Sequence, residues 1–188
     1  VYKDIVLNNS ARTRIAKKTL TSGMIMGYDM FNEYHEYIDN TAKIEWLHDF
    51  LQDTDEVVTI LYTYNVELDI LENLMKKLGK KYIKINGKTK DKYAEVNEKE
   101  YDVVLGQFQA ISEALDGLQY KSHIEIFYSM PESSILYKQA IGRIDRIGQE
   151  KVPMYYFLIM EKTIDEAIME LIENKIEYSQ ELLNKLEV

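Results

Sequence analysis

The sequence contains no cysteine, and its three histidines, His35, His48 and His123, are scattered. Without cysteine the chain has no disulfide framework and no thiolate metal site, and the separated histidines argue against a zinc site. Long apolar runs are also missing, since the longest, such as residues 57–62, are far too short to cross a membrane. No basic and then apolar leader opens the chain, so we expect a soluble, cytoplasmic protein.

The remaining composition is that of one globular domain. The 188 residues suffice for one domain with a sizeable core and are too few for two ordinary ones. The first residue is valine rather than methionine, and we therefore expect a piece excised from a longer protein. The abundance of lysine and asparagine is typical of an AT-rich microbe or its virus, which suggests a microbial or virus-infected microbial cytoplasm.

The net charge of −9 argues against a protein that coats nucleic acid non-specifically. The charge is nevertheless uneven, because residues 76–92 contain eight lysines and a single acid, Asp91. One interpretation is a solvated helix end and loop. The other is a local phosphate-contacting patch on an otherwise acidic domain, and the sequence leaves both open.

From residue 41 onward, β-rich runs alternate with helical patterns. We expect one helix after Thr41 and another over residues 66–78, ended by Gly79. The predicted strands are residues 57–62, 82–86, 103–105, 123–128 and 153–160. This alternation predicts an α/β fold with a mostly parallel sheet covered by helices on both faces. Such sheets bind ligands in the loops after the carboxyl ends of their strands.

The predicted domain has three parts. Residues 1–53 form a helical lead, with a helix over residues 12–20 and an aromatic, loop-like stretch over residues 28–37. Residues 54–160 form the α/β core. Residues 161–188 form a long C-terminal helix, from Thr163 to Leu186, whose apolar stripe packs on the sheet of the same domain or, alternatively, docks a partner or a second copy through its distal half.

Two signatures of nucleotide hydrolysis are incomplete. Gly87-Lys88-Thr89 resembles the end of a Walker A loop, but Tyr82 stands where that loop requires its leading glycine. Asp55-Glu56 resembles a Walker B pair, but it precedes its strand, whereas the chemistry needs these acids at the strand's end. The chain therefore lacks the phosphate cradle and the magnesium carboxylate that hydrolysis of a nucleoside triphosphate requires.

Residues 139–149 read Gln-Ala-Ile-Gly-Arg-Ile-Asp-Arg-Ile-Gly-Gln. On a continuous helix, Gln139, Arg143 and Arg146 would fall within an arc of roughly 60°. Gly142 would let a backbone or a phosphate approach closely. Two guanidinium groups held in this way suit the charge that develops on a transferring phosphoryl group.

The residues alone also allow a second interpretation of this stretch. It could be a surface helix whose arginines pair with acids such as Asp145 or Glu150. Spacing does not separate the two interpretations.

The stretch over residues 139–149 resembles motif VI of superfamily 2 motors, in the Swi/Snf-type form Gln-Ala-x-x-Arg-x-x-Arg-Ile-Gly-Gln. The resemblance implies a RecA-like second motor lobe, a fold of the P-loop NTPase kind but without a P-loop. It implies that Arg146 is an arginine finger towards ATP held on the other lobe, and that Arg143, Gln139 and Gly142 also serve the nucleotide cleft. Gly142 replaces the acidic residue usual in Swi/Snf proteins and matches wider superfamily 2.

Further segments resemble the family in the same order along the chain. Residues 41–51 are similar to the lysine-containing helix that leads into the second lobe, and residues 60–64 are similar to motif IV. Residues 85–89 resemble the turn of the next strand on the nucleic-acid track, with asparagine for the usual acid. Residues 103–106 and 115–119 resemble motif V, although residues 110–114 lack its glycines.

The resemblance also assigns individual residues. The expected sequence-independent backbone contacts to nucleic acid are Thr63, Gly87, Lys88, Thr89 and Gly106. Asp116 and Gly117 would lie on the nucleotide side, where Asp116 could contact a ribose or simply cap a turn.

The implied function is the second lobe of an ATP-dependent DNA helicase or translocase. Its partners would be an N-terminal RecA-like lobe of the same protein and, weakly and non-specifically, the double-stranded DNA backbone. ATP and Mg²⁺ would be held mainly by that first lobe, with no metal or cofactor bound tightly by this monomeric segment. The alternatives are the motor lobe of a restriction or repair system, a non-catalytic helicase-like interaction domain and, more distantly, a module that dimerises through its last helix.

We predict that the purified chain alone hydrolyses no ATP, because it lacks the phosphate cradle. A steady-state ATPase assay, on protein free of contaminating hydrolases, measures this. Robust turnover would mean that residues 82–89 bind phosphates despite the missing glycine.

Overall fold

The structure is a computed structural model that describes residues 10–28, 33–38, 41–113 and 115–174. In chain order its elements are α1 (Ser10–Thr21), β1 (Met24–Tyr28), β2 (Glu33–Tyr37), α2 (Ala42–Asp53), β3 (Val58–Tyr62), α3 (Asn65–Leu78), β4 (Tyr82–Ile85), α4 (Lys92–Asn97), β5 (Val103–Gln107), α5 (Phe108–Ser112), the 3₁₀ turn η1 (Leu118–Tyr120), β6 (Ile124–Phe127), α6 (Ser134–Ile141), β7 (Met154–Phe157) and α7 (Ile164–Glu173). None of the helices in this described part is long and apolar enough to cross a membrane.

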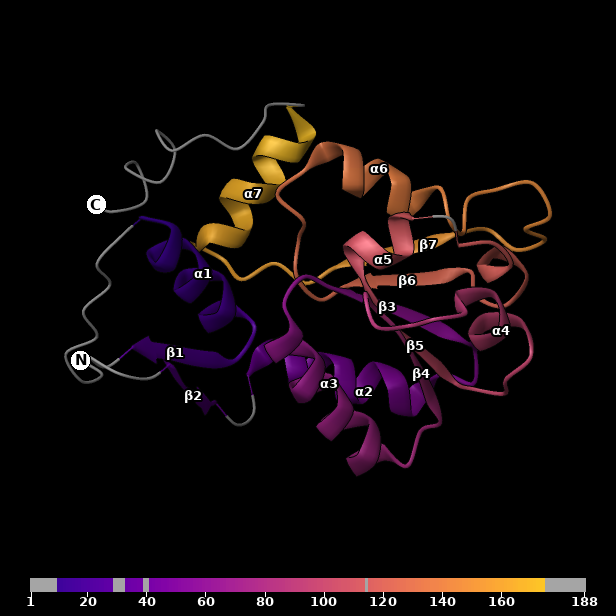
Figure 1. Ribbon diagram of the computed structural model, residues 1–188, viewed down its shortest axis with the longest axis horizontal. Helices are drawn as coiled ribbons and strands as arrows, with labels where there is room; N and C mark the ends of the chain where they lie inside the picture. The colour runs from indigo at the N-terminus through magenta and orange to yellow at the C-terminus, as the bar shows by residue number, and fades with distance from the viewer. Residues whose placement is uncertain (1–9, 29–32, 39–40, 114, 175–188) are drawn as a thin grey trace.

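Five parallel strands form one sheet in the order β4-β5-β3-β6-β7 (Figure 1). The central strand β3 pairs on both sides, with Val58 opposite Val103 of β5 and opposite Ile124 of β6. All five predicted strands are therefore confirmed, and so is the RecA-like α/β class.

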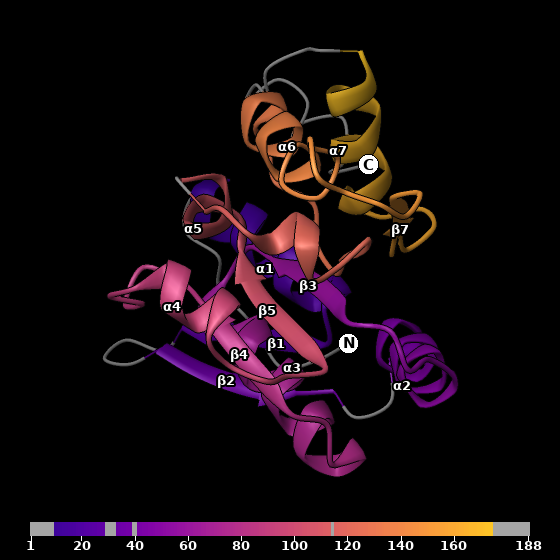
Figure 2. The same cartoon turned by 90° about the vertical axis from the view of Figure 1, so that its right-hand side faces the viewer.

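Helices cover both faces of this sheet. Figures 1 and 2 show α2 and α3 on one side and α6 and α7 on the other. Side chains alternate along β3 accordingly, because Ile60 and Tyr62 pack under α2 and α3 while Leu61 packs with residues of α5, α6 and α7. Burial on both faces explains why the strands read as nearly continuous apolar runs.

The expected helix over residues 66–78 is confirmed as α3. Its last turn ends at Gly79, which adopts the left-handed conformation with φ 68° and donates its N–H to the carbonyl of Lys76. Glycine tolerates this conformation, so the sequence signal for the helix end has a direct physical cause.

The N-terminal lead differs from the prediction in one place. The stretch over residues 28–37 was expected to be a loop, but β1 and β2 pair as an antiparallel hairpin, with Met24 opposite Tyr37. Tyrosine and isoleucine favour strands, and this propensity outweighs the polar residues between them. The predicted helix before the hairpin is confirmed as α1.

The C-terminal helix is described as far as α7, whose Ile164, Ile168 and Ile172 pack into the core on the α5–α7 face. Most of the rest of the predicted helix, up to Leu186, lies outside the described residues.

A buried ion pair joins the lead to α7 at the carboxyl ends of the strands. Lys43, at the start of α2, lies 2.6 Å from Oδ2 of Asp165 and donates to the carbonyl of Tyr128, directly after β6, at 3.0 Å. Thr21, the last residue of α1, donates to the other oxygen of Asp165 at 2.9 Å. Both charged side chains are at most 3% exposed, so their mutual attraction and hydrogen bonds must offset the loss of their hydration.

A second buried carboxylate, that of Glu67 in the first turn of α3, lies at the same junction. It accepts hydrogen bonds from the backbone N–H groups of Thr63 at 2.8 Å and Tyr64 at 2.9 Å. It also accepts from the hydroxyls of Ser22 at 2.5 Å and Ser129 at 2.8 Å. One side chain thus fastens the end of β3 to the lead and to the end of β6.

Lys18 of α1 completes the junction. It is 1% exposed and donates to the carbonyl of Met130 at 3.0 Å. Burial lowers the pKa of Lys18, while the nearby carboxylates of Glu132 and Glu67 act in the opposite direction.

Glu125, in the middle of β6, is the exception among these buried charges. Its two carboxyl oxygens have no hydrogen-bond partner within the described part of the chain. Burial raises the pKa of Glu125 well above its usual range, which favours the neutral form at this position.

We predict that Lys43→Ala lowers the free energy of unfolding by about 3–5 kcal/mol, because it leaves the Asp165 carboxylate buried and unpaired. Urea denaturation measures the effect. Lys81→Ala is the matched control, since Lys81 pairs with Glu100 on the surface at 3.9 Å, and it should cost at most about 1 kcal/mol. Equal losses in the free energy of unfolding would show that the buried pair stabilises the fold no more than the surface pair does.

Candidate nucleotide and nucleic-acid sites

The arginines of the 139–149 stretch do not lie on a continuous helix. α6 ends at Ile141, and Gly142 caps it with its N–H donated to the carbonyl of Lys138. Arg143 and Arg146 therefore lie in the turns beyond α6, and the predicted arc is wrong. The helix brings Arg143 to its end, and tertiary contacts, not helical periodicity, decide where the guanidinium groups point.

Arg143 is held by backbone carbonyls of the loop between α5 and η1. Its Nη1 donates to the carbonyl of Leu115 at 3.1 Å, and its Nη2 donates to the carbonyl of Ser112. Its Nε is buried without a hydrogen-bond partner among the described residues. Burial, followed by repulsion from Arg146, lowers the pKa of Arg143 from its ordinary high value. The guanidinium is thus fixed in orientation by its two terminal nitrogens, while its Nε has no partner among the described residues.

Arg146 forms an ion pair with Asp116 of the same loop. The acids that the sequence suggested as partners, Asp145 and Glu150, are not the ones it pairs with in the structure. Both side chains of the pair are accessible, with 44% of Arg146 and 66% of Asp116 exposed. Motif VI and the irregular motif V thus meet, although 30 residues separate them in the sequence.

Gly117 is the neighbouring residue whose backbone requires glycine. Its φ is +102°, and a Cβ at this position would lie 2.3 Å from Oδ1 of Asn97. Asn97, in turn, donates to the carbonyl of Asp116 at 3.3 Å. Asp116 is therefore presented by a loop that α4 and the glycine hold in place.

Gln139 and Gly142 lie apart from this group of contacts. Gln139 is exposed on α6, one turn before Arg143, and Gly142 is exposed at the helix end with φ −66°. Of the predicted nucleotide-binding residues, the structure brings together Arg143, Arg146, Asp116 and Gly117.

The end of the motif has a role that the sequence reasoning missed. Gln149 donates to the carbonyl of Ser122 at 3.0 Å, directly before β6, and to that of Ile144 at 3.4 Å. Gly148 has φ +99°, and a Cβ there would lie 2.5 Å from the ring of Tyr120. The Gly-Gln ending of the motif thus fastens the Arg146 segment to the strand before it. The only signal in the sequence was the motif spelling itself.

The expected nucleic-acid residues lie elsewhere, at the carboxyl ends of β3 and β4. Thr63 follows β3, with its N–H fixed by Glu67 and its hydroxyl accepting from Ser129 at 2.9 Å. After β4, Thr89 and Asn86 close a turn in which Asn86 accepts from the N–H of Lys88 at 2.9 Å. Asparagine therefore builds the turn in which the family usually has an acid.

Gly106 is buried inside β5. A Cβ at this position would lie 2.5 Å from Cγ1 of Ile111, so the missing side chain lets α5 pack against the sheet. Contact of its backbone with nucleic acid stays a prediction.

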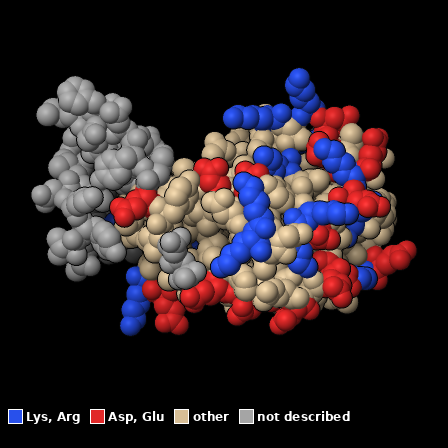
Figure 3. All heavy atoms as spheres, turned by 90° about the horizontal axis from the view of Figure 1, so that it is seen from below, with Lys and Arg blue, Asp and Glu red and all other residues tan. Residues whose placement is uncertain are grey.

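Some of the lysines over residues 76–92 are engaged within the chain. Lys84 pairs with Glu72 at 3.0 Å, and Lys92 donates to a backbone carbonyl at 2.8 Å. Lys88 and Lys90 are exposed in and beside the turn after β4. On the face where α2 and α3 lie, basic side chains cross the middle and acidic ones gather towards the edges (Figure 3). The phosphate-contacting interpretation stays a prediction, for which Lys88 and Lys90 are the lysines at the turn.

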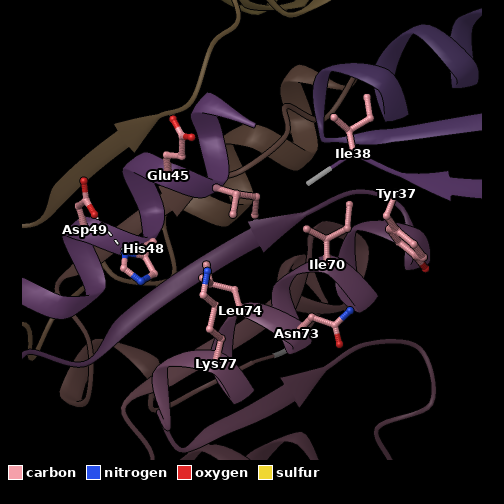
Figure 4. A pocket seen from close by; sticks show the side chains of 10 residues that line it. Tyr37, Ile38, Glu45, His48, Asp49, Ile70, Asn73, Leu74 and Lys77 are labelled. Carbon is pink, nitrogen blue, oxygen red and sulfur yellow. Dashed lines mark hydrogen bonds and ion pairs between the residues drawn. The ribbon is translucent and has the colours of Figure 1, made fainter. Parts of the chain in front are cut away.

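A separate hollow of about 410 Å³ lies between α2 and α3 (Figure 4). Its floor is apolar, with Ile44, Ile70 and Leu74, and its rim carries charged groups such as Lys77. None of the predicted nucleotide or nucleic-acid residues lines it, and α2 and α3 are on the opposite face of the sheet from α6.

Comparison with known proteins identifies the family. The sequence profile described as "Helicase conserved C-terminal domain" matches residues 42–148, which is more than half of the chain. The chain is 27% identical, over 141 residues, to the human and mouse proteins named "SWI/SNF-related matrix-associated actin-dependent regulator of chromatin subfamily A containing DEAD/H box 1". That match covers 72% of this chain and 14% of each relative.

A shorter match is 33% identical over 70 residues to the Bacillus subtilis protein named "Uncharacterized ATP-dependent helicase YqhH", covering 37% of this chain and 12% of that protein. The fold is similar to a crystal structure of the C-terminal part of the Fun30 ATPase domain, with a TM-score of 0.68 at 22% identity, covering 79% of this chain and 52% of that one. The chain thus spans a small part of these relatives. It belongs to the helicase conserved C-terminal domain family, and its similarity to the SWI/SNF-related proteins and to the Fun30 domain fits the expected second RecA-like lobe of the Swi/Snf type.

Proposed function

We propose that this chain is the second motor lobe of an ATP-dependent DNA helicase or translocase, and that Arg143 and Arg146 act on ATP held by a first lobe. One observation carries the proposal: both guanidinium groups converge on the loop over residues 112–117, where Arg146 meets Asp116.

Arg146 has the features that an arginine finger needs. It is partly exposed, and its partner is a carboxylate. Carboxylate and phosphate oxygens accept the same charge-assisted hydrogen bonds from a guanidinium, so a phosphate can replace Asp116 as the partner of Arg146. Arg143 is less free than Arg146 to change partners, because it donates to two backbone carbonyls. Through them it orients the segment that leads to Asp116. Charge developing on the transferring phosphoryl group would be stabilised by Arg146 and supported by Arg143.

The residues of this chain fit the phosphates of ATP better than its magnesium ion. No three acidic or histidine side chains gather into a metal site in the part of the chain that the structure describes. Asp116 is the acid of this group, and Arg146 engages it. ATP and Mg²⁺ would therefore be held mainly by the first lobe, where the magnesium ion neutralises charge on the phosphates.

The nucleic-acid track would follow the carboxyl ends of β3 and β4, with contacts from Thr63 and the turn over residues 86–89 to the double-stranded DNA backbone. Such contacts are independent of base sequence. β5 links the two regions, because Gln107 at its end donates to the carbonyl of Thr63 at 3.3 Å and the chain then runs through α5 to Asp116. This continuity supports coupling between DNA and ATP. We place the intact motor in a microbial cytoplasm.

We predict that Arg146→Ala, in the protein that also carries the first lobe, lowers ATP turnover by at least about tenfold, because the transition state loses a guanidinium. Lys138→Ala, an exposed cation on α6, is the control and should leave the rate unchanged. Undiminished turnover in a folded Arg146→Ala protein would rule out the finger assignment.

We predict that this chain binds double-stranded DNA weakly, with an affinity that falls as salt rises, because the contacts are to phosphates. Replacing Lys88 and Lys90 together by alanine should remove this binding, as measured by fluorescence anisotropy. Replacing Lys76 and Lys77, exposed at the end of α3, is the charge-matched control. Equal losses in both double variants would indicate a general charge effect rather than a track.

A further inference from the structure

A second feature lies beside the Arg146–Asp116 pair. It is a pocket of about 480 Å³, lined by Tyr93, Asn97, Asp116, Gly117, Gln119, Tyr120, Arg146 and Ile147. A volume of this size falls within the range of small-molecule sites. The pocket therefore combines the charged pair with two aromatic rings.

The apolar groups of this pocket are unusually exposed. Tyr93 is 61% exposed, Tyr120 67% and Ile147 95%. Single exposed apolar side chains are common on protein surfaces, but here three of them line one hollow. Such a cluster indicates a surface that is covered when the protein works.

The backbone that carries Tyr93 and the ring of Tyr120 both lie beside the loop of Asp116. Asn97 donates to the carbonyl of Tyr93 at 3.0 Å and to that of Asp116 at 3.3 Å, which ties α4 to the loop. Tyr120 lies against Gly148 of the motif, where a Cβ would approach its ring to 2.5 Å. The backbone of α4 at Tyr93, the ring of Tyr120, the Asp116 carboxylate and the Arg146 guanidinium thus meet at one pocket.

We propose that this pocket binds the nucleoside end of the ATP molecule, with the purine ring stacked on Tyr93 and Tyr120. This inference rests on the proposed function, and it adds a base subsite to this lobe. Aromatic rings are good platforms for the flat face of a purine. The carboxylate of Asp116 accepts hydrogen bonds from ribose hydroxyls, while Arg146 reaches the phosphates.

The chemistry of the pocket favours a nucleotide over a protein surface as its occupant. A purely apolar partner would bury the Arg146–Asp116 pair and lose its hydration. A nucleotide offers a ring for the tyrosines, hydroxyls for the carboxylate and phosphates for the guanidinium. Closure of the first lobe directly on the rings is the alternative, and the experiment separates the two.

The test compares ATP with inorganic tripolyphosphate, which has the phosphates but no nucleoside. Both are titrated into the purified chain, without magnesium and at low salt, and NMR chemical-shift changes report the affinities. We expect ATP to bind roughly fivefold to a hundredfold more tightly than tripolyphosphate, which is the range that one stacked base supplies.

The variants assign this preference to the rings. Tyr120→Ala and Tyr93→Ala should each reduce the preference for ATP while leaving the affinity for tripolyphosphate unchanged. Tyr120→Phe should retain the preference, because it keeps the ring. Tyr37→Ala, which removes a 45% exposed ring from β2, is the control and should change neither affinity. Since Tyr120 packs on Gly148, thermal unfolding checks its variants, and Tyr93→Ala provides an independent reading.

The outcomes separate this subsite from the proposed function. Arg146→Ala should weaken both anions, and a failure to do so contradicts the role of the arginine. If ATP and tripolyphosphate bind equally, or if both alanine variants keep the preference, the base subsite is wrong while phosphate recognition by Arg146 stands. If tripolyphosphate binds but ATP shows no saturable binding in the millimolar range, the proposal of a base subsite is also wrong.

Discussion

The buried pair of Lys43 and Asp165 is the interaction on which the arrangement of this lobe depends. It joins the start of α2 to the start of α7, and it fixes both to the carbonyl after β6. An ion pair so deeply buried is stabilising only when hydrogen bonds complete it, and Thr21 from α1 supplies one. The lead, the sheet and the C-terminal helix therefore meet at one polar centre in addition to their apolar contacts, and the partners that this centre requires specify how they dock.

The same centre reaches the expected nucleic-acid track. Glu67 holds the backbone of Thr63 from below and accepts from Ser22 of the lead, so the geometry at the end of β3 depends on the docking of the lead. The track residues are thus not an isolated loop on a finished sheet. They are the outer surface of a buried network, and a change in the network would be felt at the surface.

The predicted nucleotide-binding residues are positioned by backbone carbonyls and glycines rather than by buried charges. Backbone carbonyls hold Arg143, a left-handed glycine presents Asp116, and Gly148 seats the segment that follows Arg146 against Tyr120. The group lies on the α5–α7 side of the sheet, whereas the track lies along the strand ends. α/β sheets commonly bind ligands at the strand ends, and the proposed nucleic-acid track takes that position here. Segment 103–117 connects the two groups, which gives a motor a direct mechanical path between them.

The sequence by itself determined the order of strands and helices, the end of α3 at Gly79 and the identity of the arginine-bearing motif, because periodicity, left-handed glycine and motif spacing are local properties. Only the tertiary structure decided that β1 and β2 pair, that α6 stops before Arg143 and that Arg146 meets Asp116 instead of Asp145 or Glu150. It also decided that Lys43 pairs with Asp165, 122 residues further along the chain, and that Tyr93 and Tyr120 share a pocket. Such contacts depend on how distant segments pack, and no local pattern records the partner that a charged or aromatic side chain finds there.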